Sequence, residues 1–186
     1  KVRNESGDWC AEDEYGAPIY DSDGSQICGD GMIMPDGTKL NRGKGFDYKG
    51  MSPPKDSPNI LVVLFDDVGF SDFGCYGSPI STPVIDKISE AGLRYTGFHT
   101  TAMCSTTRAS LLTGRNHHSV GVGCLANFDN GYAGYRGKIS SDSGTLAEIL
   151  ALNGYRNYMV GKWHVTPLTE SGPTGPFNGW PLGRGF

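Results

Sequence analysis

The apolar residues of this chain gather in its C-terminal two thirds, in short runs that alternate with amphipathic stretches. Residues 60–65 are continuously apolar and rich in β-branched side chains, as in a strand buried on both faces of a parallel sheet. Residues 93–98 and 155–160 are predicted as two further strands, each of which leads into polar residues. The pattern indicates an α/β protein with a mostly parallel central sheet.

Two helices are predicted from start and stop signals around these strands. Thr82 is a typical N-cap, Pro83 suits the first helical position, and Gly92 follows the last apolar position. The sequence Thr145 to Glu148 has the form of a capping box, which predicts a helix through Leu152. The first helix has one apolar face, expected to point inward and made of Val84, Ile85, Ile88 and Ala91.

A third helix is predicted just after Cys104, and its start has the features of an anion site. Hydroxyl residues 105–107 can cap this helix, and Gly114 can end it. Cys104 then lies where free backbone N–H groups and the helix dipole stabilise a thiolate or a tetrahedral anion. Arg108 follows one turn later and can lie beside it. The alternative is a small buried cysteine without chemistry.

Charged residues follow two of the predicted strands. Asp66 and Asp67 come directly after residues 60–65, and two adjacent carboxylates at a strand end are most easily stabilised by a cation. Lys162 and His164 follow the strand 155–160 and face the same side if this segment is extended, which suits binding an anion and transferring a proton. The alternatives are a solvated aspartate turn and a surface lysine beside a hydrogen-bonded histidine.

Composition and charge narrow the possible functions. Of 186 residues 37% are hydrophobic, as in a globular protein, and 28 are glycine, which predicts many turns. Residues 1–58 hold 11 acidic and 7 basic side chains, whereas residues 59–186 hold 9 of each. Because no Lys/Arg cluster occurs, neither nucleic acid nor an anionic membrane surface is an expected partner. No apolar run reaches the roughly 20 residues that span a bilayer.

Residues 1–58 are predicted to be a polar, Gly/Pro-rich extension and linker, and residues 59–186 to form a separate region that carries the candidate chemistry. Five cysteines without CxxC spacing argue against zinc and thioredoxin-type sites. Cys10 and Cys28 flank a Gly/Asp-rich loop, where a disulfide is expected if the protein is exported, and Asn4 begins a glycosylation sequon. Export to an extracellular, periplasmic or lysosome-like compartment is therefore favoured.

Three motifs, in order, resemble those of the formylglycine-dependent (type I) sulfatases of the alkaline phosphatase superfamily. They are residues 59–67, the stretch from Cys104 to Arg108 with the following Leu-Leu-Thr-Gly-Arg, and residues 161–164. Thr106 stands where that family usually has proline. The resemblance implies an alkaline-phosphatase-like sandwich and covers residues 59–186, as the N-terminal part of a domain of several hundred residues.

The resemblance also implies a mechanism. Cys104 would be oxidised to formylglycine by the formylglycine-generating enzyme, and its hydrate would attack the sulfur of a sulfate monoester. Ca²⁺, or Mg²⁺, would be bound by Asp66, Asp67 and residue 104. Arg108 would hold the formylglycine, Lys162 would bridge it to a sulfate oxygen, and His164 would assist proton transfer. The family's remaining ligands are expected on a further part of the same protein.

Three other functions remain open. A phosphonate monoester or phosphodiester hydrolase of the same superfamily has the same cysteine motif and aspartate pair. A processed subunit or fragment of a larger sulfatase would be inactive alone. An ordinary cysteine hydrolase would keep Cys104 as a thiol and use a histidine as its base.

Overall fold

Helices, short turns and extended loops form the part of the chain that the computed structural model describes, residues 2–3, 9–10, 32–33, 39–40 and 52–186. Its four two-residue strands pair as two antiparallel ladders, β1 (Val2–Arg3) with β2 (Trp9–Cys10) and β3 (Met32–Ile33) with β4 (Lys39–Leu40). The side chains of Asn4, Cys10 and Cys28 lie outside the described residues, so the sequon and the disulfide stay predictions.

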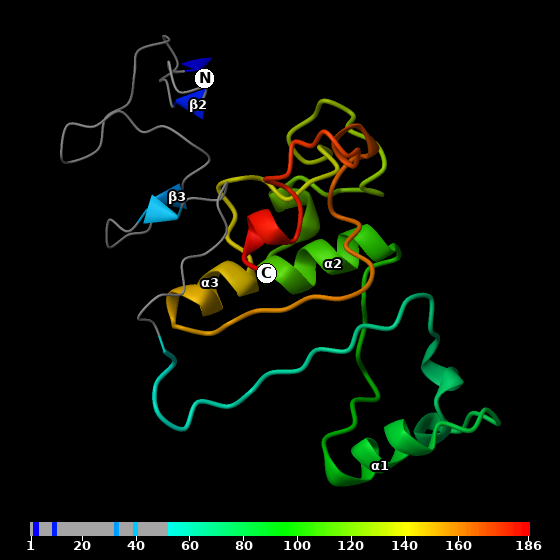
Figure 1. Cartoon of the computed structure of the whole chain (residues 1–186). Coiled ribbons are helices and arrows are strands. Elements are labelled where there is room, and N and C mark those ends of the chain that lie inside the picture. The colour runs from blue at the N-terminus through cyan, green and yellow to red at the C-terminus, as the bar shows by residue number, and fades with distance from the viewer. Residues whose placement is uncertain (1, 4–8, 11–31, 34–38, 41–51) are drawn as a thin grey trace.

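Three α-helices and five 3-10 turns follow in the order η1, η2, α1, α2, η3, α3, η4, η5. The α-helices are α1 (Pro83–Ala91), α2 (Cys104–Thr113) and α3 (Leu146–Leu152). The 3-10 turns are η1 (Phe70–Asp72), η2 (Gly74–Tyr76), η3 (His117–Val120), η4 (Leu168–Glu170) and η5 (Leu182–Arg184). In Figure 1, α2 and α3 lie together beside the loops of the C-terminal half, and the segment that carries α1 extends away from them.

The helix boundaries confirm the start and stop signals. Thr82 precedes α1, Pro83 is its first residue and Gly92 follows it, as predicted, but the Thr82 hydroxyl makes no cap hydrogen bond and donates to Asp86 instead. At α3 the Thr145 hydroxyl accepts a hydrogen bond from the Glu148 N–H, and the Glu148 carboxylate accepts one from the Thr145 N–H at 2.6 Å. This reciprocal pair is the capping box that the sequence predicts.

The predicted strands are wrong for the described residues, because segments 60–65, 93–98 and 155–160 are extended or bent and pair with no neighbouring strand there. Their apolar side chains are correspondingly open to solvent, with Leu61 87% and Val160 97% exposed. A strand buried on both faces needs hydrogen-bonded neighbours along its edges and packed layers above and below. No segment within the described ranges supplies either, so no parallel sheet forms among them.

The apolar face of α1 is also exposed, contrary to the expectation that it points inward. Val84 is 69% and Ile88 63% exposed, and α1 has no buried residue. Polar contacts hold it instead to η2. The Asp86 carboxylate accepts hydrogen bonds from the Cys75 N–H at 2.7 Å and from the Thr82 hydroxyl at 3.0 Å.

The hydrophobic core of the described part lies beside α2. It consists of buried aliphatic residues, with one side chain of α2 and one indole packed against them: Ala109, Val120, Val122, Ile139, Val165, Leu112 and Trp163. Residue 165 comes directly after the predicted Lys/His pair, and Ala109 directly after Arg108. The core therefore fixes the two segments that carry the candidate chemistry against each other. None of the helices in the described residues is both long and apolar enough to cross a bilayer.

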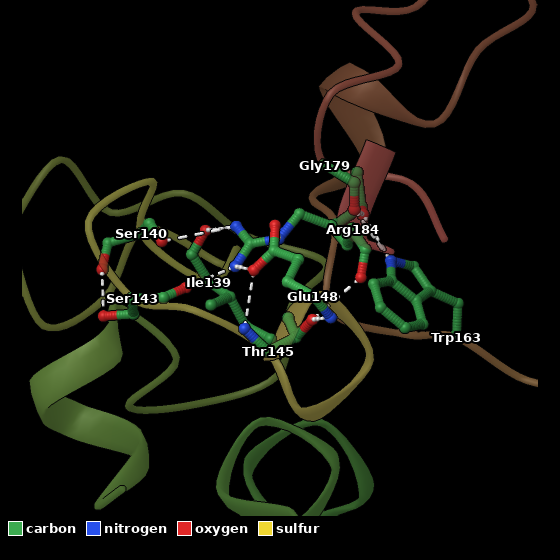
Figure 2. A network of polar contacts seen from close by, with 9 residues as sticks. Ile139, Ser140, Ser143, Thr145, Glu148, Trp163, Gly179 and Arg184 are labelled. Carbon is green, nitrogen blue, oxygen red and sulfur yellow. Dashed lines mark hydrogen bonds and ion pairs between the residues drawn. The ribbon is translucent and has the colours of Figure 1, made fainter. Parts of the chain in front are cut away.

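A buried ion pair attaches the last residues to α3 (Figure 2). Arg184 is 2% and Glu148 1% exposed, and Arg184 Nε lies 3.2 Å from Glu148 Oε1. The guanidinium also donates to the Ser143 carbonyl, and the Thr145 hydroxyl donates to the Arg184 carbonyl at 2.8 Å. The capping box and the ion pair thus share the Glu148 carboxylate, which couples the start of α3 to η5.

Replacing Arg184 by methionine should lower the free energy of unfolding by about 3–5 kcal/mol, because the Glu148 carboxylate would stay buried without its cation. Chemical denaturation followed by circular dichroism measures this. The matched control is Arg136→Met, which removes an arginine paired with Asp129 at a site where its side chain is 46% exposed. The control should cost at most about 1 kcal/mol. Equal losses for the two variants would contradict a structural role for the buried pair.

Candidate active site

Cys104 is the first residue of α2, so the helix begins one residue earlier than the sequence predicts, and the preceding Met103 has extended backbone angles. At the other end Gly114 adopts a left-handed conformation, with φ of 65°, and its N–H bonds to the Ser110 carbonyl. The predicted hydroxyl cap is wrong, because α2 has no side-chain cap hydrogen bond. The first N–H groups of this helix are therefore not used by a capping side chain beside Cys104.

The hydroxyl groups after Cys104 bind neighbouring loops instead. Thr101 Oγ1 lies 2.6 Å from both Thr106 Oγ1 and Thr107 Oγ1, and Thr106 also donates to the Met103 carbonyl at 2.8 Å. Ser105 Oγ, which is fully buried, accepts a hydrogen bond from the Ala126 N–H at 3.0 Å. These bonds fix the turn before Cys104 and bring a distant loop to it.

Arg108 lies on α2 behind Cys104 and is 9% exposed. Its Nη1 donates to the Lys162 carbonyl at 2.5 Å, and its Nη2 lies 3.4 Å from Asp66 Oδ1. One guanidinium thus joins α2 to both segments that carry the predicted polar strand ends.

Asp66 and Lys162 form an ion pair, with 2.7 Å between Oδ2 and Nζ. The bond to Lys162 is the main cause that lowers the pKa of Asp66, and Arg108 contributes in the same direction. The same bond, together with a weaker interaction with Cys104, raises the pKa of Lys162. Both groups therefore stay charged at neutral pH, with the ammonium between the Asp66 carboxylate and residue 104.

His164 contacts Cys104 directly, with 3.1 Å between Nδ1 and Sγ. Its other ring nitrogen, Nε2, lies 2.6 Å from Asn127 Oδ1. Burial is the largest cause that lowers the pKa of His164, and the nearby charges of Lys162 and Arg108 act in the same direction. A neutral imidazole therefore faces residue 104 at neutral pH, in a state that can accept a proton.

The structure brings most of the predicted site residues together. Asp66, Arg108 and Lys162 contact one another, and Cys104 contacts His164, two residues after Lys162. Asp67 follows in a left-handed conformation, with φ of 55°, and makes no hydrogen bond or ion pair within the described residues. No three histidine, cysteine or acidic side chains gather there into a cation site either, and the metal role of Asp66, Asp67 and Cys104 stays a prediction.

A cleft of about 500 Å³ opens beside Lys162 and His164. Its walls are mainly apolar and aromatic, with a few polar side chains, and consist of Asn127, Trp163, Thr166, Leu168, Ser171, Trp180 and Pro181 in addition to the two site residues. Both indoles are held by hydrogen bonds, since Trp163 Nε1 donates to the Gly179 carbonyl at 2.9 Å and Trp180 Nε1 donates to the Glu170 carbonyl at 2.8 Å. The cleft thus has fixed aromatic walls next to the cationic and imidazole groups.

Comparison with known proteins assigns the family of this site. The family model described as Sulfatase matches residues 58–186. The chain belongs to the sulfatase family. It is 42% identical over 115 residues to an uncharacterised sulfatase of Schizosaccharomyces pombe, and 40% identical over 124 residues to human arylsulfatase A. It is also 34% identical over 113 residues to an arylsulfatase of Klebsiella aerogenes.

These matches cover 58%, 64% and 60% of this chain but only 21%, 22% and 24% of the three relatives. The chain therefore spans between a fifth and a quarter of the length of these sulfatases. Membership of the family implies the alkaline-phosphatase-like α/β fold that the sequence predicts. The parallel sheet of that fold is absent from residues 52–186.

Sequence reasoning missed Asn127, which binds the imidazole that faces residue 104. Asn127 lies in a Gly- and Tyr-rich loop without periodicity, between residues 119 and 140. The contact spans 37 positions in the sequence. No local pattern marks an asparagine in such a loop, so only the tertiary structure identifies it.

His164 should make the stability of this chain depend on pH. Because burial lowers its pKa below 6.5 in the folded chain, the unfolded chain binds more protons as the pH falls through about 6.5. The free energy of unfolding should therefore decrease from pH 7.5 to 5.5, and less steeply in His164→Asn. Urea denaturation at several pH values measures the slope. The control His99→Asn, which removes an exposed histidine, should run parallel to the parent, and an unchanged slope in His164→Asn would contradict the prediction.

Proposed function

We propose that the protein to which these residues belong hydrolyses sulfate monoesters, with residue 104 as the nucleophile. The observation that carries the proposal is the placement of Cys104 at the start of α2, with Lys162 and His164 beside it and Arg108 one turn behind. Two cations and a neutral imidazole around a helix N-terminus suit an anionic tetrahedral group. Membership of the sulfatase family supports the choice of sulfate.

Formylglycine derived from Cys104 would supply a hydrate with two hydroxyl groups. One of its oxygens would attack sulfur and displace the alcohol of the ester, and the other hydroxyl, on losing its proton, would re-form the aldehyde and expel sulfate together with the first oxygen. In this proposal Lys162 binds a sulfate oxygen and stabilises its charge, which its raised pKa supports. Arg108 holds residue 104 and the Lys162 backbone in place. His164 accepts and returns the protons of the hydrate through Nδ1, which lies 3.1 Å from Cys104 Sγ.

The proposed cation ligands are the carboxylates of Asp66 and Asp67 and the oxygen that replaces Sγ at residue 104. An all-oxygen set suits a hard cation, Ca²⁺ or Mg²⁺. Such a cation would supply positive charge to the nucleophile and to the sulfate group. Asp66 is already oriented toward Lys162, which supports its place at the edge of the anion site.

The cleft beside Lys162 and His164 is the proposed place for the alcohol part of the substrate, either a small sulfate ester or a sulfated glycan. Two relatives are named arylsulfatases, and the indoles of the cleft suit a flat ring. The formylglycine-generating enzyme is the proposed partner in maturation, and a further part of the same protein the proposed source of the remaining ligands. The protein is also proposed to be exported, to an extracellular, periplasmic or lysosome-like compartment.

One observation favours a second candidate, a hydrolase in which Cys104 stays a thiol. Cys104, His164 and Asn127 form a continuous chain of contacts at 3.1 and 2.6 Å, and a Cys-His-Asn arrangement is the catalytic set of some thiol hydrolases. The sulfatase family match weighs against this candidate. No comparable observation favours a phosphodiester hydrolase.

The nucleophile is tested on the active protein by mass spectrometry of the tryptic peptide 95–108. The mass of formylglycine is expected at residue 104, and Cys104→Ala should abolish hydrolysis of an aryl sulfate. The matched control Cys124→Ala removes a partly buried thiol outside the contacts of the site and should keep the activity. Unmodified cysteine in an active preparation that iodoacetamide inhibits would contradict formylglycine and favour the thiol hydrolase. Faster turnover of a phosphodiester than of a sulfate ester would contradict the proposed substrate.

The proposed cation ligands are tested by thermal unfolding with and without Ca²⁺ or Mg²⁺. Cation binding to the folded protein should stabilise it by about 2.7 kcal/mol at a hundredfold excess over Kd. Asp67→Asn should remove most of this gain, because it removes a charged ligand. Asp142→Asn, which changes an exposed aspartate elsewhere, is the control and should keep it. An equal gain in all three proteins would contradict a cation at Asp67.

A further inference from the structure

His164 is bound at both ring nitrogens, and only one of the two contacts is with residue 104. Nε2 lies 2.6 Å from Asn127 Oδ1, and Nδ1 lies 3.1 Å from Cys104 Sγ. We propose that Asn127 is a positioning residue, which keeps the ring proton of His164 on Nε2 and leaves Nδ1 as an acceptor that faces residue 104. The kinetic part of this inference rests on the proposed function, whereas the position of the proton does not.

The chemistry of the two contacts determines the tautomer. An amide oxygen only accepts hydrogen bonds, so a neutral imidazole that binds it must donate from Nε2. Nδ1 then carries a lone pair, directed at the atom of residue 104. In the opposite tautomer Nδ1 would carry the proton, and His164 could not take one from residue 104. Asn127 thus decides whether the imidazole can act as a base toward the nucleophile.

Asn127 is itself held on both sides. The preceding residue, Ala126, is fully buried and donates its N–H to Ser105 Oγ, one residue after Cys104. The Asn127 carbonyl accepts a hydrogen bond from the Leu168 N–H at 3.4 Å, four residues after His164. The loop is therefore tied to the nucleophile's helix at one end and to the histidine's segment at the other.

The backbone of His164 needs such support. Its φ is 55°, a left-handed conformation that is uncommon for a residue other than glycine and that persists where the surroundings impose it. The buried residues Val165, Thr166 and Pro167 fix the backbone on the C-terminal side. Ring orientation is a separate degree of freedom, and the contact with Asn127 fixes it.

Nitrogen-15 NMR of the ring nitrogens of His164 in the full chain, at a pH where the ring is neutral, tests the proton position. The parent should show a protonated Nε2 and an unprotonated Nδ1. Asn127→Leu, which keeps the size but removes the acceptor, should give a mixture of tautomers. Asn127→Asp, which keeps an acceptor oxygen, should restore the parent pattern. If the spectrum of the parent chain shows the proton on Nδ1, the proposal is overturned. This outcome is measured on the parent alone and does not depend on whether a variant folds.

Kinetics on a sulfate ester test the consequence. Asn127→Leu should lower kcat by about 10- to 100-fold, the usual cost of losing the partner that orients a catalytic side chain. Because Asn127 also lines the proposed substrate cleft, the fall in kcat, and not the value of KM, measures the positioning role. Asn127→Asp should recover much of the loss. The control Asn130→Leu changes an exposed asparagine in the same loop and should match the parent.

A kcat in Asn127→Leu equal to that of the parent would overturn the positioning role. A chain with the expected tautomer that hydrolyses no sulfate ester would support the hold of Asn127 on His164 and contradict the proposed function. The two proposals therefore fail by different measurements.

Discussion

The arrangement of the site depends on the Arg108 guanidinium. It is almost fully buried, and it binds the Lys162 backbone on one side and the Asp66 carboxylate on the other. These partners lie 54 residues after it and 42 before it. A buried guanidinium without partners would be costly, so burial beside the hydrophobic core selects the arrangement in which all three segments meet. The position of Lys162 next to residue 104 follows from this constraint.

Local signals in the sequence predicted the helices because each signal acts within one turn. The capping box joins Thr145 to Glu148 within one turn, and Gly114 ends α2 because it adopts a left-handed conformation without strain. The strands could not be predicted in this way, since a strand is completed by partners elsewhere. The run 60–65 has the right composition, yet without paired neighbours in the described residues it is an exposed, extended segment.

The candidate site shows the same division. Charged groups at predicted strand ends identified Asp66, Lys162 and His164, and the helix start identified Cys104, because residue type and local position carry that information. Neither its residue type nor its local position identifies Asn127 as a site residue. Its role comes from one contact with a ring 37 residues away, and from a loop anchored by Ser105. Ser105 was expected to cap α2, but its hydroxyl accepts a hydrogen bond from that loop instead. A buried hydroxyl must form a hydrogen bond, and the tertiary fold decides which partner lies within reach.

The Asp66 carboxylate binds Lys162 and Arg108, and it is also a proposed cation ligand. Its geometry allows both. Oδ2 accepts from Lys162 at 2.7 Å, and Oδ1 accepts a longer contact of 3.4 Å from Arg108. Two carboxylate oxygens offer about four lone-pair directions, so both contacts leave room for a cation. Asp66 is 40% exposed, and ion pairs this open contribute little to stability. Its contacts therefore orient the carboxylate more than they stabilise the fold. A cation bound there would share the negative charge of Asp66 with Lys162 without displacing the ammonium.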